Sequence, residues 1–559
     1  MLDILPYRAD YYPVLGQIMR EMDVAGTINR IVDAGDSQAK IDVGTFVCLM
    51  IHNLLGDVNI RLYNMDSFFE DKALPLLVPW QSHIDISEIN DDRAARVLDT
   101  MWMADPQKVF SAVANESICI HELDTSIIHG DTTSKSFQGV FDNTDGDELA
   151  PIVTFGHNKD HRPDLKQLIF GVGTTADGIP IMAEVTDGNE SDKTLNGRWV
   201  KNLRSVLGKD IQDFLLYVAD SALVTTPNLH LMDKYHIDFI SRLPGTFSVE
   251  GELKRKALSD DSWESIGKLS EEKKAATYQS CEMTGEIDGM TYRFVIIKSD
   301  QKDKRKLKAL DRAVEREHKA LTKDLEELIK RPFACKRDAE IEAERFLKEH
   351  DVKYHITDWE IGEKTEKVKR EKRGRPRNGE KIPSQMNYYL AGKLHRNDQT
   401  YKTDRELCGL FVLITSLMDV KKYSSRLILE RYKGQGNVER IFKFIKNPAW
   451  IGSFCLKKPE RIAALGYLVL MAAMIYTLWE RRVRKALSDL DVAPIEGLNR
   501  QKTRKPTAFA LQKGMSSILV LSQIVDGQLS MWLPKPLKTN QKRILELSGL
   551  SDKIYNSVP

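Results

Sequence analysis

Two aspartates each follow a short apolar run and could hold a metal ion. Asp131 follows the run SIIHG, and Asp220 ends the run DFLLYVAD. If both runs are strands of an open α/β sheet, both carboxylates lie at the carboxyl ends of strands, where such sheets place their ligand sites. An aspartate at a strand end is also a common turn former, so a purely structural role stays open for each. The deciding residue is a third carboxylate further along the chain.

That third carboxylate is Glu439, in the segment RYKGQGNVERIFKFIKN. If the segment is one helix, five residues gather within about 60° of one another on one face, at about 100° per residue: Tyr432, Gln435, Glu439, Lys443 and Lys446. The apolar residues of the segment lie on the opposite side. A carboxylate aligned with lysines and an aromatic ring suits a metal site beside a phosphate backbone.

Two alternatives remain for this segment. Glu439 and Lys443 are spaced as an ordinary i,i+4 ion pair on a solvated helix face. Gly434 and Gly436 each disfavour a helix interior by about 1 kcal/mol. The second alternative is a helix that begins only at Asn437, a residue type favoured at the N-cap.

Together these residues resemble the DDE insertion-sequence transposases, and within them the group built around insertion sequence four. The hallmark of that group is Tyr, two residues, Arg, three residues, Glu, six residues and Lys. This chain has Tyr432, Gln435, Glu439 and Lys446 in the same order, with glutamine in place of arginine. Glutamine lacks the charged fork of arginine, so one DNA contact is affected while the metal ligands are retained.

The resemblance extends through ordered motifs from about residue 120 to 485. HGDTTSKSFQG, which contains Asp131, is similar to the first-aspartate region, and VADSA supplies Asp220. Between them, residues 157–172 contain KDHRPDLKQ, and residues 188–192 form the loop GNESD. The long interval before Glu439 resembles a β-rich insertion.

The resemblance implies a fold, a metal site and a reaction. The fold is α/β, with an RNase H-like mixed sheet, flanking helices, a large β-rich insertion and a helical N-terminal domain. Asp131, Asp220 and Glu439 are the expected catalytic residues and ligands of two Mg²⁺ ions, with Mn²⁺ as a substitute. The reaction is hydrolysis at transposon ends, followed by transfer of the 3′-hydroxyl into target DNA.

The expected partner is double-stranded DNA, namely terminal inverted repeats and target DNA, bound by a homodimer on paired ends. By analogy, Tyr432, Gln435, Lys443 and Lys446 contact the DNA. Two other functions stay open: an RNase H-like DNA nuclease without strand transfer, and a domesticated protein that only binds DNA.

Two basic segments are further candidates for DNA contact. The first is a loop with four basic side chains: Lys159, His161, Arg162 and Lys166. The second runs from 367 to 381, where Arg373-Gly374-Arg375-Pro376 resembles the core of an AT-hook for the minor groove. An ordinary surface loop and a solvated linker are the structural alternatives.

The pattern along the chain predicts five parts. Helical periodicity over 1–121 indicates a helical domain, for which DNA-end binding is one function. Short β-branched runs over 122–228 indicate the first part of the catalytic core, in which KQLIFGVGTTADGIPIMAEV is a hairpin. The remaining parts are a β-rich insertion with a helical hairpin and the basic loop (229–408), a second core part with the Glu439 helix (409–485), and a helical C-terminal appendage (486–559).

Composition points to a folded, non-membrane protein in a reducing compartment. Hydrophobic residues make up 42% and charged residues 29% of the chain, a balance typical of globular proteins. The six cysteines form no CxxC pair, which disfavours a zinc site of usual spacing and a disulfide framework. Residues 462–479 are uncharged and long enough to cross a bilayer, but we interpret them as a buried core helix. We expect a bacterial, cytoplasmic, nucleoid-associated protein.

Overall fold

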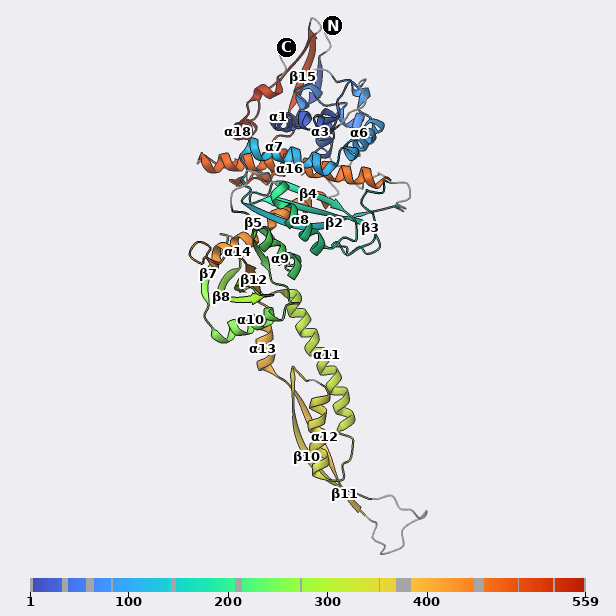
Figure 1. Cartoon of the computed structure of the whole chain (residues 1–559), viewed down its shortest axis with the longest axis vertical. Helices are drawn as coiled ribbons and strands as arrows, with labels where there is room; N and C mark the ends of the chain where they lie inside the picture. The colour runs from blue at the N-terminus through green and yellow to red at the C-terminus, as the bar shows by residue number, and fades with distance from the viewer. Residues whose placement is uncertain are drawn as a thin grey trace. The chain divides into compact units, whose positions relative to one another are not determined.

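The computed structural model describes most of the chain, in two compact units (Figure 1). The described residues are 4–32, 39–56, 65–81, 84–139, 141, 147–206, 214–271, 274–350, 352–367, 384–446, 457–490, 492–525 and 528–556. The first unit comprises residues Met1–Pro244, Glu286–Tyr292 and Ile414–Pro559, and the second comprises Gly245–Gly285 and Arg293–Leu413.

The first unit begins with a short strand and a group of helices. They are β1 (Leu5–Arg8), α1 (Tyr12–Glu21), α2 (Val24–Asn29), α3 (Val43–Leu54), α4 (Met65–Phe69), α5 (Leu74–Leu77), α6 (Asp91–Met103) and α7 (Pro106–His121). Side chains cap the longer helices: the Asp42 carboxylate accepts from the Thr45 N–H, and the Asn90 side chain accepts from the Arg93 N–H. Such caps satisfy amide donors that a helix start leaves without partners.

A mixed sheet follows, with strands in the order β4-β3-β2-β5-β6. The strands are β2 (Ile127–Phe137), β3 (Lys166–Thr175), β4 (Pro180–Thr186), β5 (Leu216–Ala219) and β6 (Asp238–Arg242). β2, β3 and β4 pair antiparallel, which confirms the predicted hairpin, whereas β2, β5 and β6 pair in parallel. Helix α8 (Asp192–Val206) connects β4 to β5, and α9 (Thr226–Lys234) connects the parallel strands β5 and β6. The expectation of a mixed α/β fold with flanking helices is confirmed.

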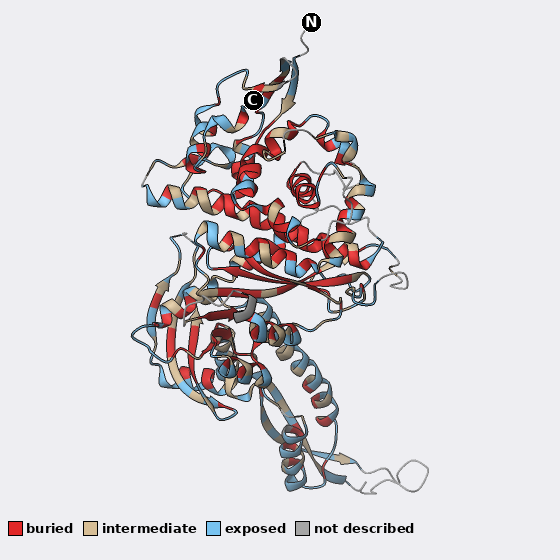
Figure 2. Cartoon of the chain, turned by 45° about the horizontal axis from the view of Figure 1, so that its top comes forward, coloured by how far each residue is buried: buried red, intermediate tan, exposed pale blue. Residues whose placement is uncertain are grey.

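The apolar segment near the end of the chain is the helix α16 (Pro459–Asp489). It is the one helix in the described residues that is long and apolar enough to cross a membrane, but 94% of its apolar window is buried inside the protein. It packs against α3, α6, α7 and β4, and most of its length is buried in Figure 2. These contacts support the interpretation as a core helix.

Four further helices and a second small sheet complete the first unit. α14 (Ser425–Lys433) and α15 (Gly436–Lys446) precede α16, and α17 (Ala508–Gly514) and α18 (Thr539–Leu547) follow it. β15 (Leu519–Val525) lies between β1 and β16 (Gln528–Trp532), so the first strand of the chain pairs with one near its end. A helical appendage was expected over 486–559, but the segment also contains these strands and the short pair β13 (Ile495–Glu496) and β14 (Lys502–Thr503).

The second unit contains a four-stranded part and a helical hairpin on a long β-ribbon. The four strands follow the order β12-β9-β8-β7: β12 (Leu410–Thr415), β9 (Met290–Ser299), β8 (Thr277–Ile287) and β7 (Glu264–Lys268). The strand ends at residues 286–287, 290–292 and 414–415 belong to the first unit. The other elements are α10 (Ser248–Asp260), α11 (Lys304–Leu328), α12 (Lys336–Glu349), β10 (His355–Lys367), β11 (Ser384–Arg396) and α13 (Asp398–Leu407).

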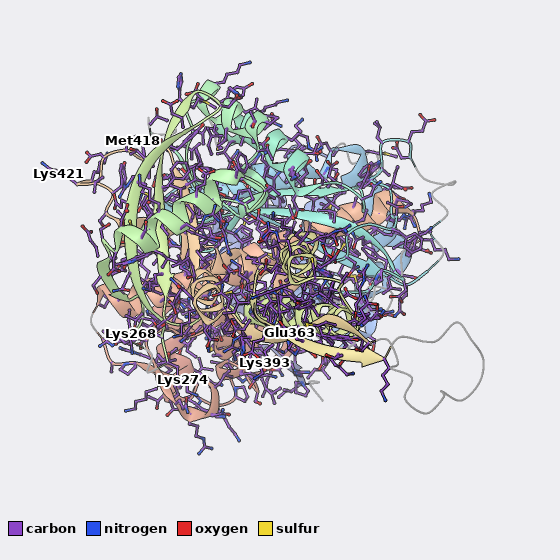
Figure 3. All side chains as sticks on the ribbon, turned by 90° about the horizontal axis from the view of Figure 1, so that it is seen from below. Lys268, Lys274, Glu363, Lys393, Met418 and Lys421 are labelled. Carbon is purple, nitrogen blue, oxygen red and sulfur yellow. The ribbon has the colours of Figure 1, made fainter. Side chains whose placement is uncertain are left out.

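The predicted amphipathic helix is α11, which buries Leu321, Leu325 and Leu328 in a core shared with α12 and Leu390 of β11. The ribbon also carries exposed charged side chains, including Glu363 and Lys393 (Figure 3). β6 lies within the expected insertion of 229–408 and α9 crosses its first boundary, but both belong to the first compact unit.

Candidate active site

The parallel pairing of β2 and β5 brings the two aspartates to neighbouring strands. Gly130 is paired with Ala219, and each of these residues directly precedes one of the aspartates. The Asp220 carboxylate also accepts the Ala222 N–H at 3.0 Å and so begins a short 3₁₀ turn. A turn-forming role and a ligand role are therefore compatible at this residue.

Burial and like charge perturb both carboxyl groups. Burial raises the pKa of Asp131 to about 7; the Asp220 carboxylate adds to the increase, and the Lys159 ammonium opposes it. Burial also raises the pKa of Asp220, with Asp192 adding to it. Two buried carboxylates of like charge favour a bound cation, because a cation offsets both desolvation and repulsion. The oxygen donors at this position fit a hard divalent ion.

A lysine and a third aspartate fix the chain around Asp131. The Lys159 ammonium donates to the Thr132 carbonyl oxygen at 2.7 Å and to Thr132 Oγ1 at 2.6 Å. It also lies 3.1 Å from Asp192 Oδ2, while Thr132 Oγ1 donates to Asp192 Oδ1 at 2.5 Å. These three residues form a closed polar network beside Asp131.

Two glycines allow the loops that carry Lys159 and Asp192 to meet. A Cβ atom at Gly156 would lie 2.0 Å from the Gly188 carbonyl oxygen, and one at Gly188 would lie 2.0 Å from the Gln167 carbonyl oxygen. The Gln167 amide donates to the Gly188 carbonyl oxygen at 2.7 Å. The GNESD loop therefore packs directly on the chain that leads to Lys159.

A buried tyrosine supports the same region from within the sheet. A Cβ atom at Gly130 would lie 2.3 Å from the Tyr217 hydroxyl oxygen, so glycine leaves room for that ring. The Tyr217 hydroxyl donates to Asn196 Oδ1 at 2.8 Å, and the Asn196 amide donates to the Asp192 carbonyl oxygen at 2.9 Å. The first turn of α8 is thereby tied to β5.

The segment that carries Glu439 is not one helix. α14 ends at Lys433 and α15 begins at Gly436, so Tyr432 and Glu439 belong to different helices and Gln435 lies in the break. A Cβ atom at Gly434 would lie 2.7 Å from His129 Cε1, which shows how closely the break packs on β2. The single-helix interpretation was therefore wrong, and the helix starts one residue before the alternative start at Asn437.

Tyr432 interacts electrostatically both with Glu439 and with the aspartate pair Asp131 and Asp220. Burial raises the pKa of Tyr432; Arg242 opposes the increase, and the carboxylates of Asp220, Asp131 and Glu439 add to it. Glu439 itself is exposed, and no ion pair with Lys443 is formed within the described residues. In that same part of the chain, no three His, Cys, Asp or Glu side chains form a complete metal-binding cluster. Glu439 lies in the electrostatic neighbourhood of the aspartates without completing such a cluster.

The expected DNA-contacting residues have different environments. The Lys446 ammonium donates to Asp160 Oδ1 at 2.7 Å, and the Lys166 ammonium donates to the Phe141 carbonyl oxygen at 2.7 Å. Arg162 forms a bidentate pair with Asp164. His161 and Lys443 are exposed, whereas the Gln435 side-chain nitrogen is buried and has no hydrogen-bond partner among the residues that the structure describes. Arg373 and Arg375 lie outside the described residues.

Two charged residues near the site did not emerge from the sequence reasoning. Asp192 is the last residue of the GNESD motif, and it influences the pKa of both Asp131 and Asp220. Arg242 ends β6, the next parallel strand after β5, and it influences the pKa of Tyr432. The strand-end position that singled out Asp220 could also have singled out Arg242.

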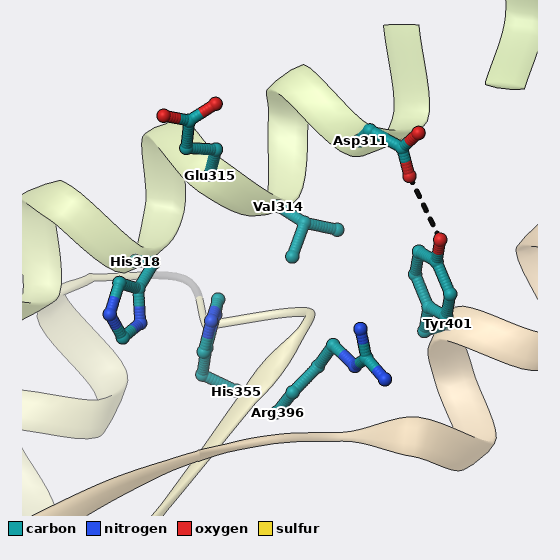
Figure 4. Close-up of a pocket in the computed structure, with 7 residues that line it drawn as sticks. All are labelled: Asp311, Val314, Glu315, His318, His355, Arg396 and Tyr401. Atoms are coloured by element: carbon teal, nitrogen blue, oxygen red, sulfur yellow. Dashed lines mark hydrogen bonds between the residues drawn. The ribbon is translucent and has the colours of Figure 1, made fainter. Parts of the chain in front are cut away.

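A pocket in the second unit contains none of the expected site residues. It has a volume of about 340 Å³ and is lined by Asp311, Val314, Glu315, His318, His355, Arg396 and Tyr401 (Figure 4). Its polar groups are largely engaged with one another or with neighbours: the Tyr401 hydroxyl donates to Asp311 at 2.8 Å, and His355 Nδ1 lies 2.9 Å from Glu317.

The fold and site define a mixed α/β protein with acidic side chains at neighbouring strand ends. The chain belongs to the family described as "Transposase DDE domain", whose model matches residues 154–475. The match includes Asp220 and Glu439 and begins after Asp131. Residues 6–115 match a "Domain of unknown function (DUF4277)".

One solved structure, "Cryo-EM structure of piggyBac transposase synaptic complex with hairpin DNA", is similar at 9% sequence identity. The similarity covers 92% of this chain and 83% of that chain, with a TM-score of 0.35. No curated protein matches the sequence.

Proposed function

We propose that this protein is a DNA transposase that cuts at the ends of its element and joins the exposed end to target DNA. Family membership supports action on DNA. The observation that carries the chemical proposal is that Asp131 and Asp220 lie on neighbouring strands. Both carboxylates, and that of Glu439, raise the pKa of Tyr432, so all three act on the same side chain. On this proposal the fold is RNase H-like, and the chain is a member of the group built around insertion sequence four.

The proposed metal ligands are Asp131, Asp220 and Glu439, and the proposed ions are two Mg²⁺, with Mn²⁺ as a substitute. When bound, such ions lower the barrier to attack on phosphorus and to departure of the leaving oxygen. Lys159, Thr132 and Asp192 hold the β2 chain beside Asp131. Lys443, exposed on α15, is available to a DNA phosphate, while Lys446 first has to leave Asp160.

The proposed reaction has two steps. In the first, water attacks the phosphorus at the element end, the P–O3′ bond breaks, and a free 3′-hydroxyl is released. In the second, that hydroxyl attacks a target phosphodiester, a new P–O bond forms, and the target's own 3′-oxygen leaves with the proton. The proposed assembly is a homodimer, because two ends have to be joined in one event.

The test compares cleavage by the wild type and by Glu439→Gln on DNA that carries the element's own ends, with Mg²⁺ present. We expect the wild type to nick at the ends, and we expect the variant to bind the same DNA while losing at least about 100-fold in rate, as expected for loss of a charged group that acts in the transition state. If both proteins bind and neither cuts, the chain is a DNA-binding protein and the proposal fails.

The same assay separates the transposase from a nuclease on the same fold. A supercoiled target plasmid added to the reaction would gain covalently joined element ends only if strand transfer occurs. Cleavage without joined products would favour the nuclease function.

A further inference from the structure

Asn437 and Arg440, which lie close to Glu439 on α15, attach this helix to its neighbours by hydrogen bonds. The Asn437 amide donates to the Ala176 carbonyl oxygen, in the β3–β4 turn, at 2.6 Å. Arg440 Nη2 donates to Asn437 Oδ1 at 3.0 Å, and Arg440 Nη1 donates to Glu480 Oε1 of α16 at 2.7 Å. The described residues show no hydrogen bond or ion pair of the Glu439 side chain, although it interacts electrostatically with Lys433 and Tyr432, so the α15 backbone sets its position.

Glu480 is a buried junction between three helices. Its Oε1 atom accepts from Arg440 of α15 and, at 2.8 Å, from Arg484 of its own helix. Its Oε2 atom accepts the Ala508 N–H, at the start of α17, at 2.7 Å. The Glu480 side chain is only 10% exposed. A carboxylate this buried is stable only when it is fully paired, so loss of one partner disturbs the others.

The same three helices, α15, α16 and α17, are also in contact one helical turn away from Arg440, Glu480 and Ala508. Phe444 of α15 packs on Tyr476 of α16, with ring centroids 5.7 Å apart. The Tyr476 hydroxyl donates to Gln512 Oε1 of α17 at 3.2 Å. Each of the three helices thus contributes two residues at i and i+4, which lie on one helix face.

From these contacts we infer that Arg440 and Glu480 are positioning residues for Glu439, and that α17 is part of the scaffold of the active site. The inference rests on the proposed role of Glu439 as a metal ligand. Arg440 is the next residue along α15, so its ion pair fixes the rotation and the depth of the helix at the turn that presents Glu439. The Ala508 N–H of α17 donates to Glu480 Oε2, and this hydrogen bond holds the Glu480 carboxylate where its Oε1 atom can accept from Arg440.

The experiment uses the full-length chain with two variants that break the junction at different points. Arg440→Met removes the charge and keeps an unbranched side chain of similar length. Ala508→Pro removes only the N–H that Glu480 Oε2 accepts, because Ala508 is the first residue of α17, where proline is tolerated. The preceding Thr507 is already extended (φ −83°, ψ 155°), which suits a residue before proline.

Asp99→Asn is the matched control. It weakens another ion pair of α16, in which Arg461 donates to both Asp99 oxygens at 2.6 and 2.7 Å, but it touches neither α15 nor α17. Thermal unfolding of the wild type and of the three variants measures how much each change lowers the stability of the fold.

Two readouts distinguish positioning from stability: kcat at saturating DNA with KM measured separately, and Mn²⁺ affinity measured by titration calorimetry without DNA. We expect Arg440→Met to lower kcat and Mn²⁺ affinity by about 10-fold or more, the usual range for residues that orient metal ligands, with little change in KM. Ala508→Pro should lower both by a smaller factor, and Asp99→Asn should lower neither. Glu480→Gln is measured alone and combined with Arg440→Met; the double variant should be no worse than the more impaired single variant, because both changes act through one contact.

The inference is overturned if Arg440→Met keeps wild-type kcat and Mn²⁺ affinity, or if Asp99→Asn lowers them equally. It is also overturned if the Arg440 and Glu480 effects on kcat multiply. Failure of the proposed function would be a different result: the wild type would neither cut DNA nor bind Mn²⁺ in a way that Glu439→Gln abolishes.

Discussion

At the scale of single residues, the Lys159 ammonium acts electrostatically on both paired aspartates. It opposes the increase in the pKa of Asp131, and it anchors both the backbone and the side chain of Thr132. Its charge therefore acts on Asp131 in two ways, by electrostatics and by fixing the strand. A lysine in such a network differs from an isolated surface lysine, whose replacement rarely changes the free energy of unfolding by more than about 0.5 kcal/mol.

We predict that Lys159→Met lowers the rate of end cleavage by about 10–100-fold, the range typical of residues that support metal ligands. Lys159→Arg should recover part of the rate, since it restores the charge without matching the three acceptors of the ammonium. The rates are measured on end-bearing DNA at saturating Mg²⁺. Lys319→Met is the control, because Lys319 is an exposed lysine of α11 that is paired with Glu315. A wild-type rate in Lys159→Met would refute the assigned role.

How far the sequence anticipates the site differs from residue to residue. Asp131 and Asp220 are recognisable because each follows an apolar run, and that local signal is enough to predict a strand end. Asp192 gives no such signal, since its contact with Lys159 depends on two loops that meet only where Gly156 and Gly188 lack side chains. The break before α15 also depends on distant residues, because Gly434 packs against His129.

At the scale of elements, α11 and α12 of the second unit are joined by a titratable pair. His350, at the end of α12, lies 2.8 Å from Asp324 of α11 through Nε2, and its Nδ1 lies 2.8 Å from the Phe346 carbonyl oxygen. The hydrogen bond to Asp324 raises the pKa of His350 above its usual 6.5. The charged imidazole is therefore favoured in the folded hairpin relative to the unfolded chain.

The predicted consequence is a pH-dependent contribution to the stability of this hairpin. A raised folded-state pKa gives stabilisation that is fully present below pH 6.5 and is lost as the pH rises through the folded-state pKa. Urea unfolding of the wild type and of His350→Gln between pH 5.5 and 8.5 should show a difference in unfolding free energy that shrinks with increasing pH. Asp324→Asn should remove most of that dependence; a difference that is constant with pH would contradict the assignment.

The elements themselves follow the sequence more closely than their boundaries do. The β3–β4 hairpin, α11 and the buried helix α16 were predicted from local periodicity and turn chemistry, and they are present. By contrast, β6 pairs with β5 although it lies in the segment expected to be an insertion. Strand pairing is a long-range choice that hydrophobic alternation within one strand does not encode.

At the scale of the whole molecule, the charge is almost balanced, with 82 basic and 81 acidic residues. DNA binding therefore cannot depend on net charge and must depend on where unpaired basic groups are presented. Lys443 is such a group, because it is exposed on the helix of Glu439 and forms no ion pair with it in the described residues.

We predict that Lys443→Gln weakens DNA binding and reduces the salt dependence of binding. The slope of log K against log salt should fall in magnitude by about 0.9, as expected for one lost phosphate contact. Fluorescence anisotropy between 50 and 300 mM NaCl measures that slope. Lys421→Gln, a change at an exposed lysine labelled in Figure 3, should leave the slope unchanged; equal slopes for wild type and Lys443→Gln would exclude a phosphate contact.

The pairing of β1 with β15 has a consequence for how the protein is made. Leu5 is registered opposite Ser522, so the first strand cannot find its partner until more than 500 residues have been synthesised. At about 5–20 residues per second, the nascent chain spends roughly half a minute to two minutes with that edge unsatisfied. The α15–α16–α17 junction is also translated late, after the whole second unit. A ribosome that stops before residue 439 therefore releases a chain that lacks both Glu439 and β15, whereas one that stops between residues 440 and 518 releases a chain that has Glu439 but leaves β1 without its partner strand.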